Sequence, residues 1–155
     1  MRTRPSSRLL VLDPENRLLL FKFEHRKGPL AGQNFWATPG GGLHRREDHA
    51  QAARRELLEE TGFLIDDPGP VVERRSVTLQ LPDGEWVCAD EHFFLVRIEA
   101  SRLLSTERWT DFEHEVMAAH RWWSPDELRS TSEQVWPEDL PEILVRSGAW
   151  SGTRV

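Results

Sequence analysis

The chain has 155 residues, 38% of them hydrophobic and 30% charged, with a formal net charge of −6 and one cysteine, Cys88. This composition indicates a single globular domain, and it excludes an internal disulfide framework, a thiolate zinc cluster and a membrane-spanning helix. The excess of acids disfavours nucleic acid as a partner, because affinity for a polyanion comes largely from cationic side chains. The first residues lack the apolar core of a signal peptide, so we expect a cytoplasmic protein with no membrane association.

The first half of the chain predicts two strands, a loop and one long helix. Two apolar runs, 8–12 and 17–23, flank turn-forming residues and predict a hairpin. A loop and a short strand then lead into a glycine turn at 39–42. Asp48 can cap a helix with Gln51 as its capping-box partner, and Gly62 is placed to end that helix.

The second half predicts a further hairpin and two short helices. Extended stretches at 71–81 and 85–98 flank an Asp-Gly turn. An acidic loop at 111–115 precedes a strand that ends at 121–123, and a helix with its own cap begins at Ser124. Residues 138–147 predict a last helix. No repeat or linker divides the chain, so we expect one domain over 1–155, built of α and β elements.

Three glutamates in the first helix form the main candidate for chemistry. Glu56, Glu59 and Glu60 are spaced i, i+3 and i+4, which places them on one helix face. Like charges at these spacings cost free energy, and anions near a helix C-terminus are further disfavoured. A divalent cation reverses this, since carboxylate oxygens are the hard ligands that Mg²⁺ and Mn²⁺ select. The alternative is an ordinary solvated face, partly compensated by Arg54 and Arg55.

The residues around these glutamates match a longer pattern, G-x5-E-x7-R-E-U-x-E-E-x-G-U, in which U is apolar. This pattern resembles the Nudix box of the Nudix hydrolases, and the preceding residues 36–42, Trp-Ala-Thr-Pro-Gly-Gly-Gly, are similar to the lead-in usual in that family. The box covers residues 41–63. Its specified positions are Gly41, Glu47, Arg55, Glu56, Leu57, Glu59, Glu60, Gly62 and Phe63.

The resemblance implies a fold and a set of site residues. The fold is α/β (α+β), a mixed β-sheet sandwiched between helices in an α/β/α arrangement. Glu56, Glu59 and Glu60 are then expected to ligate Mg²⁺ or Mn²⁺, with the Gly40 carbonyl as a further ligand. Arg55 is expected to orient the carboxylates, and Glu47 to support the loop or a second metal.

The general base is less defined. Hydrolysis of a phosphoanhydride needs metal ions to neutralise charge and activate water, and one carboxylate to accept the proton. Glu59 and Glu60 are candidates, and so are Glu113 and Glu115, because many relatives carry a loop glutamate at about this place. An exposed acidic loop without a role is the competing interpretation.

The resemblance predicts a Mg²⁺-dependent hydrolase of a nucleoside diphosphate linked to another moiety, with a small nucleotide-type substrate. A non-catalytic nucleotide-binding Nudix domain that acts as a sensor is the alternative, and a structural module with an acidic helix is a third. The chain has no tyrosine, which disfavours the diadenosine polyphosphate hydrolases. Triphosphates, nucleotide sugars, dinucleotides and RNA 5′ ends remain open, with RNA the least favoured by the net charge. A homodimer is compatible with a domain of this family.

Overall fold

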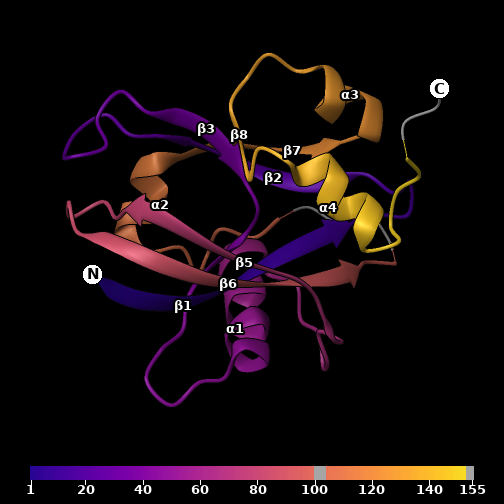
Figure 1. The fold of residues 1–155 in the computed structure, drawn as a ribbon, viewed down its shortest axis with the longest axis horizontal. Helices are drawn as coiled ribbons and strands as arrows, with labels where there is room; N and C mark the ends of the chain where they lie inside the picture. The colour runs from indigo at the N-terminus through magenta and orange to yellow at the C-terminus, as the bar shows by residue number, and fades with distance from the viewer. Residues whose placement is uncertain (100–103, 153–155) are drawn as a thin grey trace.

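The computed structural model describes residues 1–99 and 104–152, and a mixed sheet of eight strands forms its centre (Figure 1). The strand order is β5-β6-β1-β2-β3-β8, with β4 paired to β1 and β7 paired to β2. The strands are β1 (Arg2–Leu12), β2 (Leu18–Glu24), β3 (Asn34–Ala37), β4 (Gly40–Gly42), β5 (Val71–Gln80), β6 (Trp86–Arg97), β7 (Met117–Trp123) and β8 (Val135–Trp136). The helices are α1 (His49–Thr61), α2 (Asp111–Val116), α3 (Pro125–Ser130) and α4 (Leu140–Arg146).

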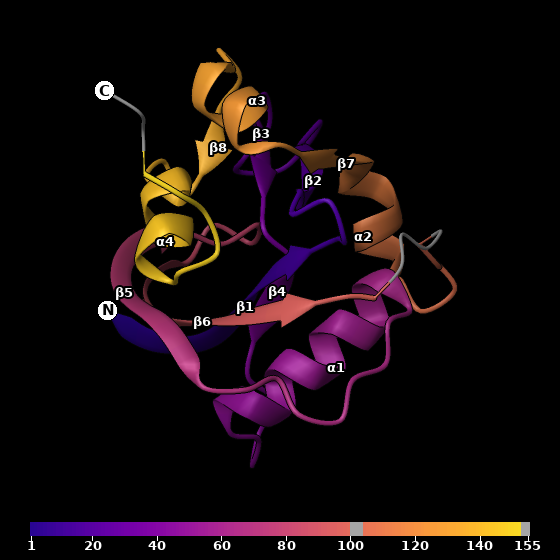
Figure 2. The ribbon, with the colours of Figure 1, turned by 90° about the vertical axis from the view of Figure 1, so that its right-hand side faces the viewer.

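Helices cover both faces of the sheet, which confirms the predicted α/β/α arrangement (Figure 2). Strand β1 pairs in parallel with β6 along its whole length, from Arg2↔Val87 to Leu12↔Arg97. Because side chains alternate along a strand, Leu9 and Val11 pack under α1 and α2, whereas Leu10 and Leu12 pack under α3 and α4. Burial on both faces explains why the sequence at 8–12 is a continuous apolar run rather than an alternation of apolar and polar residues.

The predicted first hairpin is only partly formed. β1 and β2 are antiparallel, but the one register pair between them is Leu12↔Leu18, beside the turn. Beyond that pair β1 takes β4 as its neighbour, in the register Ser6↔Gly42 to Arg8↔Gly40. The residues predicted as a glycine turn therefore form a short strand, which lies directly beside α1.

The predicted boundaries of α1 are confirmed. The Asp48 side chain accepts the backbone N–H of Gln51 at 2.7 Å, and the Gln51 side chain accepts the N–H of Asp48 at 2.9 Å. Gly62 ends the helix with φ +80°, a left-handed conformation that side chains rarely adopt. Helix α1 lies along one face of the sheet (Figure 2).

The predicted hairpin of β5 and β6 and the two predicted C-terminal helices are also confirmed. The prediction that the acidic segment 111–115 is a loop is wrong. This segment forms α2, which Thr110 caps with Glu113 as its capping-box partner. The S/T-x-x-E/Q pattern at 110–113 was the available signal for this helix. Strand β8 was not predicted, since two residues carry no periodicity. No helix in the described ranges is long and apolar enough to cross a bilayer.

Candidate metal centre and active site

The carboxylates of α1 lie against the glycines of β4. The backbone N–H of Gly40 donates a hydrogen bond to Glu60 Oε1 at 2.7 Å. A Cβ on Gly41 would lie 2.6 Å from Glu56 Oε1, closer than side-chain carbons approach oxygen in folded proteins. The hydroxyl of Ser7 on β1 donates to the carbonyl of His49 at 2.6 Å and so holds the start of α1 to the sheet. The missing side chain of Gly41 thus leaves room for Glu56, while Glu60 binds the backbone of β4 at Gly40.

Arg55 connects the carboxylates to one another. Its Nε and Nη2 donate to the two oxygens of Glu47 at 2.7 and 2.9 Å, and Nη2 also donates to the Gly42 carbonyl at 3.0 Å. Its Nη1 donates to Glu56 at 2.9 Å and to Glu59 at 3.2 Å. Burial by itself lowers the pKa of Arg55, but these hydrogen bonds and charges outweigh burial and raise that pKa. Arg55 is therefore a permanent cation that orients three carboxylates.

Glu56 and Glu60 are buried acids in an unfavourable electrostatic position. Glu60 is 2% exposed, and burial, together with the charges of Glu56 and Glu113, raises its pKa well above the ordinary value. The Gly40 N–H and the charge of Arg8 act in the opposite direction. Burial also raises the pKa of Glu56, while Arg55 lowers it. A divalent cation would stabilise both charged forms, so the donor set suits a hard metal ion.

The three box glutamates are not equally accessible. The side chain of Glu59 is 37% exposed, while that of Glu56 is 12% exposed. Glu59 therefore faces the solvent edge of the group, from which water could reach it.

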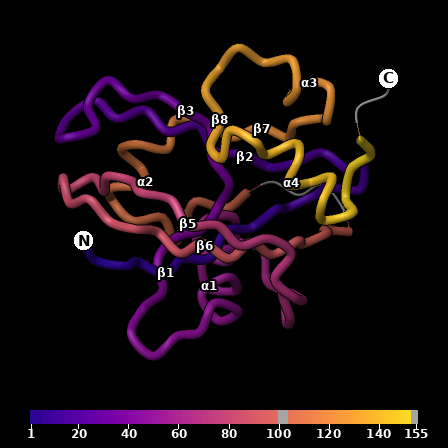
Figure 3. Tube along the Cα trace, viewed as in Figure 1, coloured from indigo at the N-terminus to yellow at the C-terminus, as the bar shows by residue number. Residues whose placement is uncertain are grey.

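The two acids of α2 lie in different surroundings. Glu113 accepts the Thr110 N–H at 2.9 Å, and its charge contributes to the raised pKa of Glu60. Glu115 instead forms an ion pair with Lys27 at 3.0 Å. It lines a hollow of about 180 Å³ together with residues of the β2–β3 loop and the β5–β6 turn. The loop and the turn lie on the same side of the molecule, with α2 between them (Figure 3).

Comparison with known proteins identifies the family. A sequence model described as NUDIX domain matches residues 2–143, which is most of the chain. This chain belongs to the Nudix family. The family predicted from the resemblance of residues 41–63 is therefore confirmed.

Individual relatives of this Nudix domain include RNA pyrophosphohydrolases. The protein of that name from Mesorhizobium japonicum is 26% identical over 151 residues, covering 92% of this chain and 81% of the relative. The one from Brucella abortus is 29% identical over 117 residues, which is 71% of this chain and 60% of the relative.

Solved structures similar to this Nudix domain support the fold. A MutT protein from Methanosarcina mazei Go1 superposes with a TM-score of 0.65 at 20% identity, covering 95% of this chain and 94% of that one. A MutT Nudix hydrolase from Burkholderia pseudomallei gives a TM-score of 0.62 at 18% identity, with 91% and 96% covered.

Sequence reasoning missed three side chains that surround the carboxylates of this Nudix domain. Trp109 donates its Nε1–H to the backbone carbonyl of Glu60 at 2.8 Å. Arg8 of β1 donates to Glu91 at 3.0 Å, and its charge lowers the pKa of Glu60. The guanidinium of Arg4 lies over Gly42, where a Cβ would be 2.8 Å from Nη2. Strand alternation gives no signal for Arg4 and Arg8, since it places them on the face of β1 opposite Leu9 and Val11, which pack under α1.

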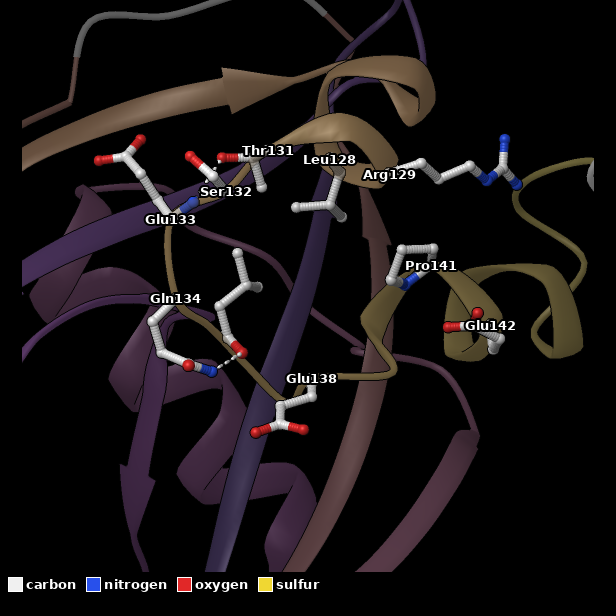
Figure 4. A pocket seen from close by; sticks show the side chains of 10 residues that line it. Leu128, Arg129, Thr131, Ser132, Glu133, Gln134, Glu138, Pro141 and Glu142 are labelled. Atoms are coloured by element: carbon white, nitrogen blue, oxygen red, sulfur yellow. Dashed lines mark hydrogen bonds between the residues drawn. The ribbon is translucent and has the colours of Figure 1, made fainter.

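A second hollow, lined by C-terminal residues, lies away from these residues. It has a volume of about 320 Å³, and α3, β8 and the start of α4 enclose it (Figure 4). Of its labelled acids, Glu133 and Glu138 lie in the loops on either side of β8 and Glu142 lies in α4, and none of the predicted site residues lines it. The carboxylate group beside β4 therefore remains the candidate active site.

Proposed function

We propose that this Nudix domain hydrolyses a phosphoanhydride bond in a nucleoside diphosphate linked to another moiety, with Mg²⁺ or Mn²⁺ as cofactor. The observation that carries the proposal is the complete set of box glutamates, two of them buried, held on one face of α1 against β4. Buried acids with raised pKa values are costly in a resting fold and are found mainly at functional sites.

The metal would be held by Glu56, Glu59 and Glu60, with the Gly40 carbonyl as a further ligand. When bound, the ion supplies positive charge at the phosphate and lowers the pKa of a coordinated water. Glu47 uses both of its oxygens on Arg55, so we assign it the role of positioning Arg55. Arg55 in turn holds Glu56 and Glu59 in place.

The chain's own cations and one exposed carboxylate complete the proposed mechanism. Arg4 and Arg8 lie beside the carboxylates and would bind the phosphate oxygens that the metal leaves uncovered. We assign the general base to the Glu59 oxygen that the metal leaves free, because this side chain is the most exposed of the three. Glu113 is the alternative base, since its charge already acts on Glu60. The hollow beside α2, which contains the half-exposed ring of Phe112, would accept the rest of the substrate.

A second candidate substrate is the 5′ end of a triphosphorylated RNA. The names of the relatives from Mesorhizobium and Brucella favour it. The net charge of −6 argues against a long RNA footprint, so the contact would be limited to the phosphates and the first nucleotides.

Activity assays with product identification test both candidates. The panel contains nucleoside triphosphates, nucleotide sugars, dinucleotides and a triphosphorylated RNA, each with Mg²⁺, with Mn²⁺ and with a chelator. We expect Glu59→Gln and Glu60→Gln to lower turnover by orders of magnitude and to keep the fold, because each removes a ligand charge. The exposed Glu138→Gln serves as the matched control. Equal activity in all four proteins would refute the metal site, and metal-dependent binding without turnover would support the non-catalytic alternative.

A further inference from the structure

A pair of stacked histidines lies at the opposite end of α1 from the box glutamates. His49 is the first residue of α1, and its ring stacks on that of His92 from β6, with centroids 3.5 Å apart and planes 8° apart. His92 and Asp90 alternate along β6 on the face that carries Phe94, which packs against α1. The Nε2 of His92 is 3.6 Å from the Asp90 carboxylate. The three side chains thus meet in the space between a helix and a central strand.

The buried nitrogen of His49 points to a missing ligand at this place. Its Nε2 is buried and has no hydrogen-bond partner within residues 1–99 and 104–152. A buried polar atom without a partner costs free energy, and native proteins contain few of them. One potential ligand atom from each of His49, Asp90 and His92 lies within 4.8 Å of the others. An ion among them would satisfy that nitrogen.

The protonation of His92 suits metal binding. Burial lowers the pKa of His92, and the neighbouring His49 and Arg74 lower it further, while Asp90 acts in the opposite direction. Two imidazolium ions cannot stack at this distance without strong repulsion. The neutral form of the His92 ring, which is the form that coordinates metals, is therefore favoured.

We propose that His49, Asp90 and His92 form a second metal site that takes a transition-metal ion such as Zn²⁺. Imidazole nitrogens prefer zinc, copper and nickel, whereas Mg²⁺ prefers oxygen ligands, so the site differs in selectivity from the box carboxylates. Tetrahedral zinc with bonds of about 2.0 Å needs ligand atoms roughly 3.3 Å apart, so atoms as far apart as 4.8 Å must move closer by up to about 1.5 Å. The nitrogen lone pairs lie in the ring planes, so one ring must also turn out of the parallel stack before both rings can point at one ion. Solvent would fill the fourth position.

The ion would fasten the start of the catalytic helix to the sheet. His49 and Glu56 are seven residues apart, which on an α-helix is two turns, about 10 Å, along the same face. A bound ion would therefore add a link between α1 and β6 without occupying the carboxylate group. The site stands independently of the proposed hydrolysis, because it shares no ligand with it.

Zinc titration of the folded protein, followed by calorimetry and thermal melting, tests the site. Saturating Mg²⁺ occupies the carboxylates, and a Cys88→Ser background removes the half-buried thiol two residues before Asp90, which could bind zinc by itself. In this background we compare His49→Gln and His92→Gln. The matched control is His44→Gln, which alters an exposed histidine near the same end of α1.

We expect one Zn²⁺ per chain and a rise in melting temperature in the background protein and in the His44→Gln control. Either substitution in the pair should weaken binding more than about 100-fold, because even outer-shell changes at metal sites cost roughly 10–100-fold. Unchanged affinity in both variants, or no stoichiometric zinc binding at all, would overturn the proposal. The NMR chemical shifts of the histidine ring nitrogens in the Cys88→Ser protein provide a second measurement, which does not depend on whether the histidine variants fold. Zinc must move the ring signals of His49 and His92 together, and a shift of neither ring would also overturn it.

Discussion

The close approach of Gly41 to Glu56 makes Gly41→Ala an informative perturbation of the candidate site. The new Cβ would lie 2.6 Å from Oε1, 3.0 Å from the carboxyl carbon and 3.3 Å from Oε2 of Glu56. Gly41 has no left-handed φ, so alanine fits its backbone and the effect arises from this contact alone. To restore an ordinary contact, the Glu56 carboxylate must move by about 0.8 Å.

The displacement sets the size of the expected effect. Glu56 is held by Arg55 at 2.9 Å, so moving it lengthens that hydrogen bond. Overpacking of this kind costs about 1–3 kcal/mol of stability, and a misplacement near 1 Å at a reacting centre costs roughly 100-fold in rate. We therefore expect Gly41→Ala to remain folded, to lose about 100-fold in kcat/KM and to show a smaller Mg²⁺-induced rise in melting temperature.

Steady-state kinetics on the substrate found in the panel, with melting curves at increasing Mg²⁺, measure both quantities. Gly152→Ala is the matched control, because a Cβ there meets no atom within 4 Å. Wild-type kinetics and wild-type Mg²⁺ stabilisation in Gly41→Ala would refute the argument that Glu56 binds the metal in the position observed.

Three further substitutions test the charges and the cap of α1. Because burial raises the pKa of Glu60, the folded protein keeps a proton that the unfolded chain loses above about pH 4.5, and metal-free stability falls as the pH rises through the raised pKa. In the presence of a chelator, Glu60→Gln should show a smaller loss of stability with rising pH and a higher melting temperature than wild type at neutral pH. A dependence of melting temperature on pH identical to that of wild type would contradict this expectation. Arg55→Lys replaces the planar guanidinium, which binds both oxygens of Glu47, by a single ammonium. It should lower the free energy of unfolding, measured in urea, by on the order of 2 kcal/mol, and it should also lower the activity. Asp48→Ala removes the N-cap and should cost about 1 kcal/mol while kcat changes little; a large loss of kcat would contradict that separation.

Features confined to one segment were predictable from the chain. The helix cap at Asp48, the stop at Gly62 and the shared face of the glutamates all depend on residues within a few turns of one another. The capping pattern at 110–113 belongs to the same class, and α2 could have been predicted from it. The hairpin of β5 and β6 also follows from a local Asp-Gly turn.

Pairing between distant segments was not predictable in this way. The hairpin expected of β1 and β2 separates after Leu12↔Leu18, because β4 and β6 take the two edges of β1. That register decides which arginines of β1 lie beside the carboxylates. Sequence periodicity assigns a residue to one face of its own strand, but it does not say which strand lies next to it.

The sequence by itself determined the chemical type of the site, since the identity and spacing of Glu56, Glu59 and Glu60 specify a cluster of hard ligands on one helix face. Only the tertiary structure decided which of these acids are buried, that the charge of Glu113 acts on Glu60 while Glu115 pairs with Lys27, and that His49 meets His92. The physical reason is that helix periodicity acts within one segment, whereas burial and charge interactions depend on how distant segments pack on the sheet.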